Sequence, residues 1–280
     1  MTETRWARPS DTASVKNLWR EAFPGEEPYL DCYFRTRYRP EETLLLTKDG
    51  APACMLAGLP MEAVLPEGRR LPGAYLYGVA TRKDCRRQGL CTALLAEADR
   101  RFADRGPACL FLVPATDTSR AVFRGAGYRD AFALRTYRQA VGELPASSAA
   151  EPLSPEDYGQ RREALLRGRY FIGCDAAALG FALRFARVAA GGFYGTDEGC
   201  ALAERLPDGG VLVRELLTVP GGETATLAAV AAALPGSYCQ VRTPAWLSGD
   251  RGDVRWFGMD RPLGDTVLPD EPGWLGIAYD

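Results

Sequence analysis

The segment Arg86-Arg87-Gln88-Gly89 stands directly before a stretch, residues 91–103, whose apolar side chains recur at helical spacing. The backbone N–H groups at the start of a helix lack hydrogen-bond partners and together carry about half a positive charge. A loop that opens such a helix can bind phosphate groups; here Gly89 allows close approach of the backbone, and two arginines add positive charge. Thr92 adds a hydroxyl group at the same end. The sequence therefore predicts a phosphate or pyrophosphate site at the start of this helix.

The elements on either side of the polar segment fit such a site. Residues 74–81 favour a strand that leads into the loop, and Gly106-Pro107 ends the helix that follows it. The apolar run 108–113 predicts a buried strand, after which come a short helix and Gly127-Tyr128. An arginine-rich surface loop that only caps a helix is the alternative interpretation. The order of strand, loop, amphipathic helix and buried strand favours phosphate binding.

The chain divides into two halves whose elements follow a similar order. In the first half, the elements expected before the loop are a strand at 3–8, a helix after Ser10-Asp11, a second helix after Pro28, and hairpin strands at 43–47 and 52–65. In the second half, they are helices at 155–167 and 175–189, hairpin strands at 199–205 and 211–217, a helix at 224–234 and a strand at 237–242. Residues 141–154 are rich in Pro, Ser and Ala without periodicity, so we predict a linker there between domains at 1–140 and 155–280. The expected fold class is α/β (α+β).

The composition excludes several classes of function. A formal net charge of −2 gives no broad electrostatic reason to bind nucleic acid or an anionic membrane. The sequence contains no His, which removes His-dependent catalytic triads and most zinc hydrolases. Its 8 cysteines include no C-x-x-C pair and suit a reducing compartment. Because we find neither an export signal nor a membrane span, we expect a cytoplasmic protein without a metal site.

With Arg86, Gly89 and Cys91, the loop resembles the acyl-CoA motif of the GNAT N-acetyltransferase superfamily, which reads Arg or Gln, two residues, Gly, one residue, then Gly or Ala. Cys91 departs from the pattern, but it is small enough for backbone amides to reach a pyrophosphate. The resemblance spans residues 4–138. It implies acetyl-CoA as co-substrate and tandem GNAT-like folds, each a mixed, mostly antiparallel sheet flanked by helices.

In this family the strand before the loop offers backbone groups to the pantetheine arm and the acetyl carbonyl, while loop amides hold the pyrophosphate. The resemblance therefore implies one set of residues for binding acetyl-CoA. They are Val79, Ala80, Thr81, Arg86, Arg87, Gln88, Gly89, Leu90, Cys91, Thr92 and Ser119.

The segments 78–81 and 123–128, together with a second domain of similar topology, are most similar to acetyltransferases of the enhanced-intracellular-survival type. Those relatives usually carry a Tyr that protonates the leaving thiolate, and Phe123 occupies that position here. They also carry a third domain whose terminal carboxylate reaches the active site, and this chain is too short for one. By this resemblance Asp280 is the candidate for the terminal carboxylate, and Tyr128 is a candidate to replace the missing acid.

The missing Tyr predicts a slower enzyme, because acid or base catalysis typically contributes about 10²–10⁴-fold and direct transfer also depends on positioning. Tyr77 and Tyr137 are alternatives to Tyr128 as replacement acids, and packing in the core or at a sheet edge is the alternative role for all three. A water molecule is a further source of the proton.

Three carboxylates, Glu26, Glu27 and Asp31, lie around the start of the second predicted helix, where related enzymes shape the acceptor pocket. If they face the pocket, the acceptor is cationic; the alternative is a solvated acidic loop. In the second half, Glu223 stands near the corresponding helix start, where a carboxylate would repel phosphate. We therefore expect no cofactor site in that half.

These observations predict an acetyl-CoA-dependent N-acetyltransferase that moves the acetyl group directly to a primary amine of a small molecule or peptide. A non-catalytic acyl-CoA-binding regulatory module is one alternative. A tandem GNAT transferase that uses aminoacyl-tRNA is another, although the net charge argues against a nucleic-acid partner. We expect no membrane partner, and a homo-oligomer is compatible with the sequence.

Overall fold

The computed structural model describes residues 1–247 and 249–279, so Asp280 lies outside the described residues. The helices are α1 (Thr12–Ala22), α2 (Glu27–Thr36), α3 (Leu90–Ala103), α4 (Asp117–Gly125), α5 (Pro155–Leu166), α6 (Ala176–Arg187) and α7 (Glu223–Ala233). The strands are β1 (Thr2–Trp6), β2 (Thr43–Lys48), β3 (Ala51–Val64), β4 (Arg70–Thr81), β5 (Cys109–Leu112), β6 (Arg129–Ala140), β7 (Glu151–Pro152), β8 (Phe171–Gly173), β9 (Gly192–Gly195), β10 (Gly199–Arg205), β11 (Val211–Thr218), β12 (Tyr238–Pro244) and β13 (Asp253–Pro262).

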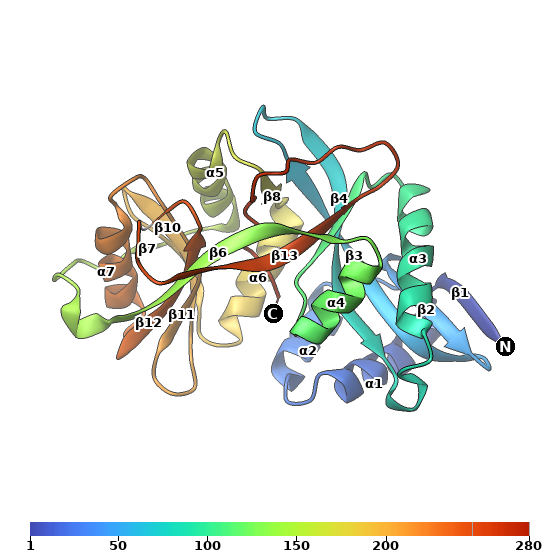
Figure 1. Cartoon of the computed structure of the whole chain (residues 1–280). Coiled ribbons are helices and arrows are strands. Elements are labelled where there is room, and N and C mark those ends of the chain that lie inside the picture. The colour runs from blue at the N-terminus through green and yellow to red at the C-terminus, as the bar shows by residue number, and fades with distance from the viewer. Residues whose placement is uncertain (248, 280) are drawn as a thin grey trace.

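One sheet runs through both halves of the described chain (Figure 1). Its strand order is β1-β2-β3-β4-β5-β13-β6-β12-β11-β10-β9-β7, and β8 pairs with β3. Two neighbouring pairs, β4 with β5 and β11 with β12, are parallel, and the other pairs are antiparallel. The predicted fold class, a mixed and mostly antiparallel sheet flanked by helices, is confirmed.

The two halves of the chain exchange their last strands. The strand β6 pairs with β12 of the second half, and β13 pairs with β5 of the first half, where Met259 lies opposite Leu112. The two exchanged strands also pair with each other and cross the middle of the molecule side by side (Figure 1). The second half therefore completes the sheet beside β5.

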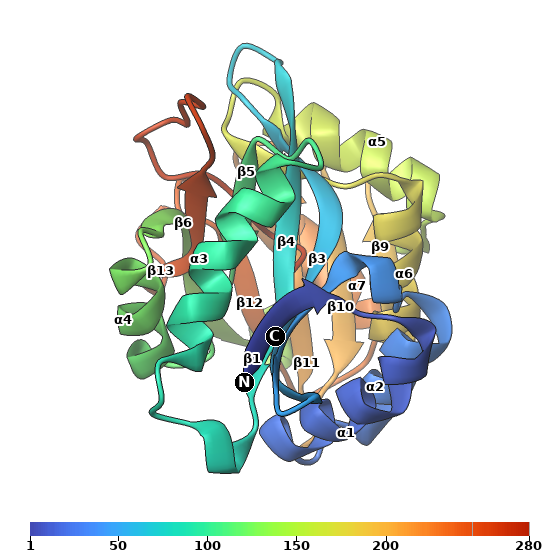
Figure 2. The ribbon, with the colours of Figure 1, turned by 90° about the vertical axis from the view of Figure 1, so that its right-hand side faces the viewer.

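Helices cover both faces of this sheet (Figure 2). On one face, α1, α2, α5 and α6 enclose a core that includes Trp19, Tyr77 and Phe181. On the other face, α3 and α4 pack over a second core, and α7 packs over a third. The predicted apolar side of α3 is confirmed, because Leu94, Leu95, Ala98 and Phe102 are all buried.

The segment 273–279 returns across the face that α1 and α2 cover. Its backbone is held where Gly273 N donates to Ala131 O at 2.8 Å and Trp274 N donates to Tyr170 O at 2.9 Å. These contacts bring the ring of Tyr279 to 5.9 Å from that of Tyr75 and 5.5 Å from that of Tyr77. An aromatic side chain from the far end of the chain therefore packs against β4.

Candidate functional site

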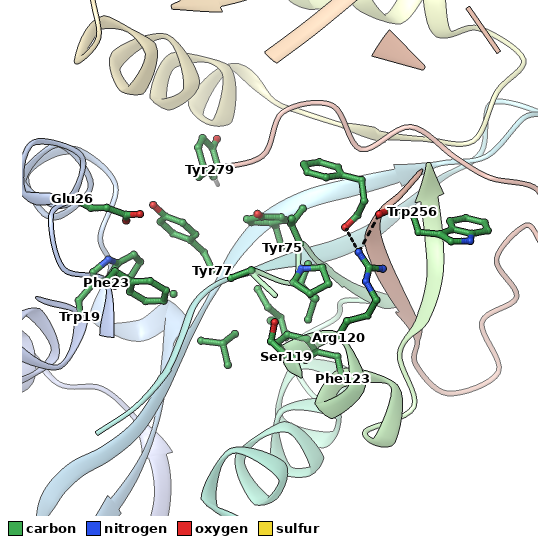
Figure 3. Close-up of a pocket in the computed structure, with 18 of the residues that line it drawn as sticks. Trp19, Phe23, Glu26, Tyr75, Tyr77, Ser119, Arg120, Phe123, Trp256 and Tyr279 are labelled. Carbon is green, nitrogen blue, oxygen red and sulfur yellow. Dashed lines mark hydrogen bonds between the residues drawn. The ribbon is translucent and has the colours of Figure 1, made fainter. Parts of the chain in front are cut away.

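The site begins where two parallel strands separate. Strands β4 and β5 pair only from Gly73–Tyr75 to Cys109–Phe111, and β4 then continues alone to Thr81. A cavity of about 410 Å³ opens beside this unpaired part of β4. Its wall comes from α1 and the loop after it, β4, the end of β5, α4, β13 and the last described segment (Figure 3).

The predicted phosphate loop follows the free end of β4. Gly89 lies directly before α3 with a φ of +75°, and no side chain caps the helix there. A Cβ placed on Gly89 would meet no atom within 4 Å, so the space in front of the first turn is open. Arg87 also has a positive φ of 60° and is exposed. The first backbone N–H groups of α3, from Leu90 to Thr92, are thus available to a phosphate group.

Other loop side chains hold this conformation in place. Arg86 Nε donates to Thr81 O at 3.1 Å, and Gln88 Nε2 donates to Asp84 O at 2.9 Å. Lys48 Nζ of β2 donates to Gln88 Oε1 at 2.9 Å. The predicted cofactor residues Arg86 and Gln88 are exposed, and their side-chain hydrogen bonds stabilise the loop.

Two thiols lie beneath the loop and join three elements. Cys54 of β3 is fully buried, and its Sγ lies 3.1 Å from Thr81 Oγ1 at the end of β4. A hydrogen bond between Cys54 and Cys91 raises the pKa of Cys54 and lowers the pKa of Cys91. Cys91, which replaces the usual Gly or Ala, thus packs inward against β3 and leaves the outer side of the helix start open.

One of the three predicted acceptor carboxylates, that of Glu26, lines the cavity. Glu26 lies on the wall beside Trp19, Phe23 and the ring of Tyr77 (Figure 3). Gly78 has no side chain, and a Cβ there would lie 2.2 Å from Trp19, so this glycine lets the indole pack against β4. Burial raises the pKa of Tyr77 well above its usual value. The Tyr77 hydroxyl is therefore neutral at physiological pH.

The other two carboxylates are engaged elsewhere. Arg20 Nε donates to Glu27 Oε1 at 2.9 Å, and Lys16 Nζ donates to Asp31 Oδ1 at 2.6 Å. Neither Glu27 nor Asp31 is among the residues that line the cavity. Both lie in surface ion pairs between α1 and α2, and their part in acceptor binding stays a prediction.

Helix α4 forms one side of the cavity and holds Phe123, the residue at the position of the missing acid. Ser119 and Phe123 both line the cavity, and Phe123 is nearly buried. Tyr128 lies behind Phe123, with ring centroids 5.8 Å apart, and does not line the cavity. The Tyr128 hydroxyl is buried without a hydrogen-bond partner, and burial raises its pKa well above the usual value. The catalytic role of Tyr128 stays a prediction, and so does that of Asp280, which lies outside the described residues.

The cavity also includes residues that sequence reasoning did not assign to a site. Arg255, Trp256 and Phe257 enter it from β13, and Tyr279 enters it from the last described segment. Arg120 of α4 fixes β13 there, because its Nη2 donates to the carbonyl oxygens of Trp256 and Phe257 at 3.1 Å each. The one signal in the sequence is the concentration of aromatic residues near its end, which favours packing between the two halves over an acceptor wall. These residues are Trp256, Phe257, Trp274 and Tyr279.

The corresponding place in the second half differs. Helix α7 begins with Glu223, and a Cβ placed on the preceding Gly222 would lie 2.9 Å from the Glu198 side chain. Two carboxylates therefore stand close to this helix start, where they oppose the binding of an anion. Among the residues that the structure describes, no group of three or more His, Cys, Asp or Glu side chains could hold a metal ion. Within residues 1–247 and 249–279, no helix has both the length and the apolar character needed to cross a bilayer.

Comparison with known proteins agrees with this geometry. Residues 3–131 match the family model described as an acetyltransferase (GNAT) domain. None of the curated proteins compared with the sequence matches it.

Solved structures resemble the fold of nearly the whole chain. A GCN5-related N-acetyltransferase from Anabaena variabilis ATCC 29413 superposes with a TM-score of 0.72 at 16% identity, over 94% of this chain and 73% of that one. Eis1 from Mycobacterium abscessus gives a TM-score of 0.68 at 14% identity, over 94% and 73% of the two chains. A putative acetyltransferase from Pyrococcus horikoshii gives 0.63 at 13% identity, over 98% and 94%. At these identities the likeness shows the fold.

Proposed function

We propose that the chain transfers an acetyl group from acetyl-CoA directly to a primary amine, because residues 3–131 match the GNAT acetyltransferase domain model. One observation carries the proposal: the part of β4 that has left β5 lines the cavity and then leads through the loop to the uncapped N-terminus of α3. A molecule of acetyl-CoA fits both places, because its pyrophosphate suits the helix start and the pantetheine arm that follows carries the thioester to the cavity.

In the reaction we propose, the amine nitrogen attacks the thioester carbonyl carbon. The C–N bond forms and the C–S bond breaks, and the sulfur leaves with the electron pair. Before the attack, the acceptor's ammonium group loses one proton to solvent or to a carboxylate, which frees the nitrogen lone pair. After the attack, the nitrogen loses a second proton and the thiolate takes one from water, which yields an amide and CoA. In this reaction, backbone groups of Val79 and Ala80 polarise the carbonyl; both residues lie on the part of β4 that has left β5.

The acceptor we propose is cationic before it reacts. Glu26 lines the cavity beside Trp19 and Tyr77, and a carboxylate in an aromatic wall favours an ammonium group. Eight free thiols in the described residues support a cytoplasmic setting for the reaction.

Two measurements test the function. Calorimetry gives the affinity for acetyl-CoA, and a thiol-release assay then screens amino acids, polyamines, aminoglycosides and lysine peptides. Micromolar binding and CoA release with one class of amine would support the enzyme. Binding without release would favour the alternative, a non-catalytic module that binds acyl-CoA. Phe123 is the observation behind this alternative, because it stands where related enzymes carry the Tyr that protonates the thiolate. No binding would contradict both.

Replacing Phe123 with Tyr is expected to leave kcat unchanged or to raise it by up to about 10²-fold, because the hydroxyl group supplies a proton donor on the cavity wall. The measurement is kcat as a function of pH for both proteins, with Phe123→Leu as a control for altered packing. A loss of activity in Phe123→Tyr at unchanged thermal stability would show that this wall does not face the leaving group.

Replacing Glu26 with Gln is expected to raise the KM for the amine about tenfold and to leave the Kd for acetyl-CoA unchanged, because one charge that attracts the ammonium group is lost. Glu67→Gln is the matched control, since its carboxylate lies in a surface ion pair with Arg69 and outside the cavity. Equal KM values for Glu26→Gln and the unchanged protein would remove Glu26 from the acceptor site.

A further inference from the structure

Three charged side chains line the cavity, and they differ in how far they are engaged. They are Glu26, Arg120 and Arg255. The Arg120 guanidinium already has partners within the protein, because Nη1 pairs with Asp130 and Nη2 donates to two carbonyl groups of β13. The Arg255 side chain is exposed and makes no hydrogen bond or ion pair with any other residue that the structure describes. It is therefore the cation on this wall that is ready to bind a ligand.

The register of β13 sets the direction in which Arg255 points. Arg255 lies opposite Leu134 in the antiparallel pairing with β6, and residues that face each other in this way project from the same side of a sheet. The Leu134 side chain is buried in the core that also holds Tyr75, Tyr77 and Tyr279. The phosphate-binding start of α3 belongs to the opposite face. Arg255 thus points to the side of Glu26 and the tyrosines.

The same face therefore presents a carboxylate from the loop after α1 and a guanidinium from β13. Aromatic side chains that include Tyr75 and Tyr77 line the cavity beside Glu26 (Figure 3). An arginine fork binds a carboxylate through two parallel hydrogen bonds, and a few placed charges in an aromatic cavity determine which ligand fits. A purely cationic acceptor would be attracted by Glu26 but would be repelled by Arg255.

We propose that the acceptor is a zwitterionic amine, whose carboxylate binds Arg255 while Glu26 attracts its ammonium group. This inference rests on the proposed function, because it names the class of amine that the transferase uses. The specificity then depends on the strand exchange, since β13 brings Arg255 from the second half to a cavity of the first.

The test compares α- and ω-amino acids with their amides, which differ only in the carboxylate. We expect the unchanged protein to show a kcat/KM about 10–100-fold higher for the acid of the preferred pair, and Arg255→Gln to remove this preference. Arg255→Glu should favour the amide instead. Arg187→Gln, a change at an exposed position of α6 outside the cavity, should behave as the unchanged protein.

The same pairs are titrated by calorimetry into protein saturated with CoA, so that the inference is tested even where no turnover occurs. Equal affinity for acids and amides in the unchanged protein would overturn it. A loss of acetyl-CoA affinity in Arg255→Gln would also overturn it, because Arg255 would then belong to the cofactor site. The proposed function fails by a different result, which is the absence of both acetyl-CoA binding and CoA release with any amine.

Discussion

Replacing Gly89 with Glu is expected to weaken acetyl-CoA binding by about 100-fold or more, measured by calorimetry. The Cβ at this position would enter open space before the first turn of α3, so the Glu side chain has room to lie where a pyrophosphate would bind. Its negative charge would lie at the positive end of the helix dipole and would repel the phosphates. CoA release should fall with the loss of binding.

The change also forces a residue with a side chain into a φ of +75°, which carries a cost in stability of its own. Gly68→Glu is the matched control, because Gly68 has a φ of +89° and equally open surroundings, but lies in the turn between β3 and β4. Both variants should lose similar thermal stability, and only Gly89→Glu should lose acetyl-CoA. Unchanged affinity in Gly89→Glu would place the cofactor elsewhere.

The helix start was readable from the sequence because everything that forms it is local. A short stretch of chain contains the strand that ends at Thr81, the polar loop and the buried face of α3. Each of these can be recognised from its own spacing of apolar residues or from its turn residues. The structure adds what spacing does not report, such as the hydrogen bond from Arg86 to the carbonyl of Thr81. The residue types alone do not indicate which side chains of the loop stabilise it through hydrogen bonds.

The acceptor side was less predictable, because it depends on where helices begin and on distant pairings. Glu26, Glu27 and Asp31 look equivalent in sequence, yet α2 begins at Glu27, so Glu26 stays in the loop that borders the cavity. Arg255 reaches the site because β13 pairs with β5 and β6 across the exchange of strands. No local pattern predicts which of several strands a short run such as 253–262 will join.

The exchange also makes the site sensitive to packing far from it. Glu215 of β11 is completely buried and binds three donors: Arg162 of α5, Tyr158 of α5 and Trp274 of the last described segment. Arg162 Nε lies 3.0 Å from Glu215 Oε2, and Trp274 Nε1 lies 2.5 Å from Glu215 Oε1. Burial alone would lower the pKa of Arg162, but the adjacent Glu215 raises it, so the guanidinium stays charged inside the protein. This cluster anchors the segment that brings Tyr279 to the cavity.

Replacing Glu215 with Gln is therefore expected to be among the most destabilising changes in the chain. It leaves the Arg162 charge buried without its partner, which typically costs about 3–5 kcal/mol, and each kcal/mol lowers Tm by about 2–4 °C in chains of roughly 150–250 residues. The measurement is Tm by calorimetry, with denaturant unfolding to give the free energy. Glu163→Gln is the matched control, because Glu163 lies on the same helix as Arg162 but pairs with Arg70 at the surface, where such a pair contributes about 0–1 kcal/mol.

The two variants should also differ in the site. If Trp274 and its segment loosen when Glu215 is lost, the KM for the amine should rise at temperatures where Glu215→Gln is still folded, while the acetyl-CoA affinity set by α3 should hold. Glu163→Gln should leave both constants unchanged. A Glu215→Gln protein as stable as the control would mean that the cluster tolerates a neutral amide in place of the carboxylate. The last described segment would then be held mainly by the backbone hydrogen bonds of Gly273 and Trp274.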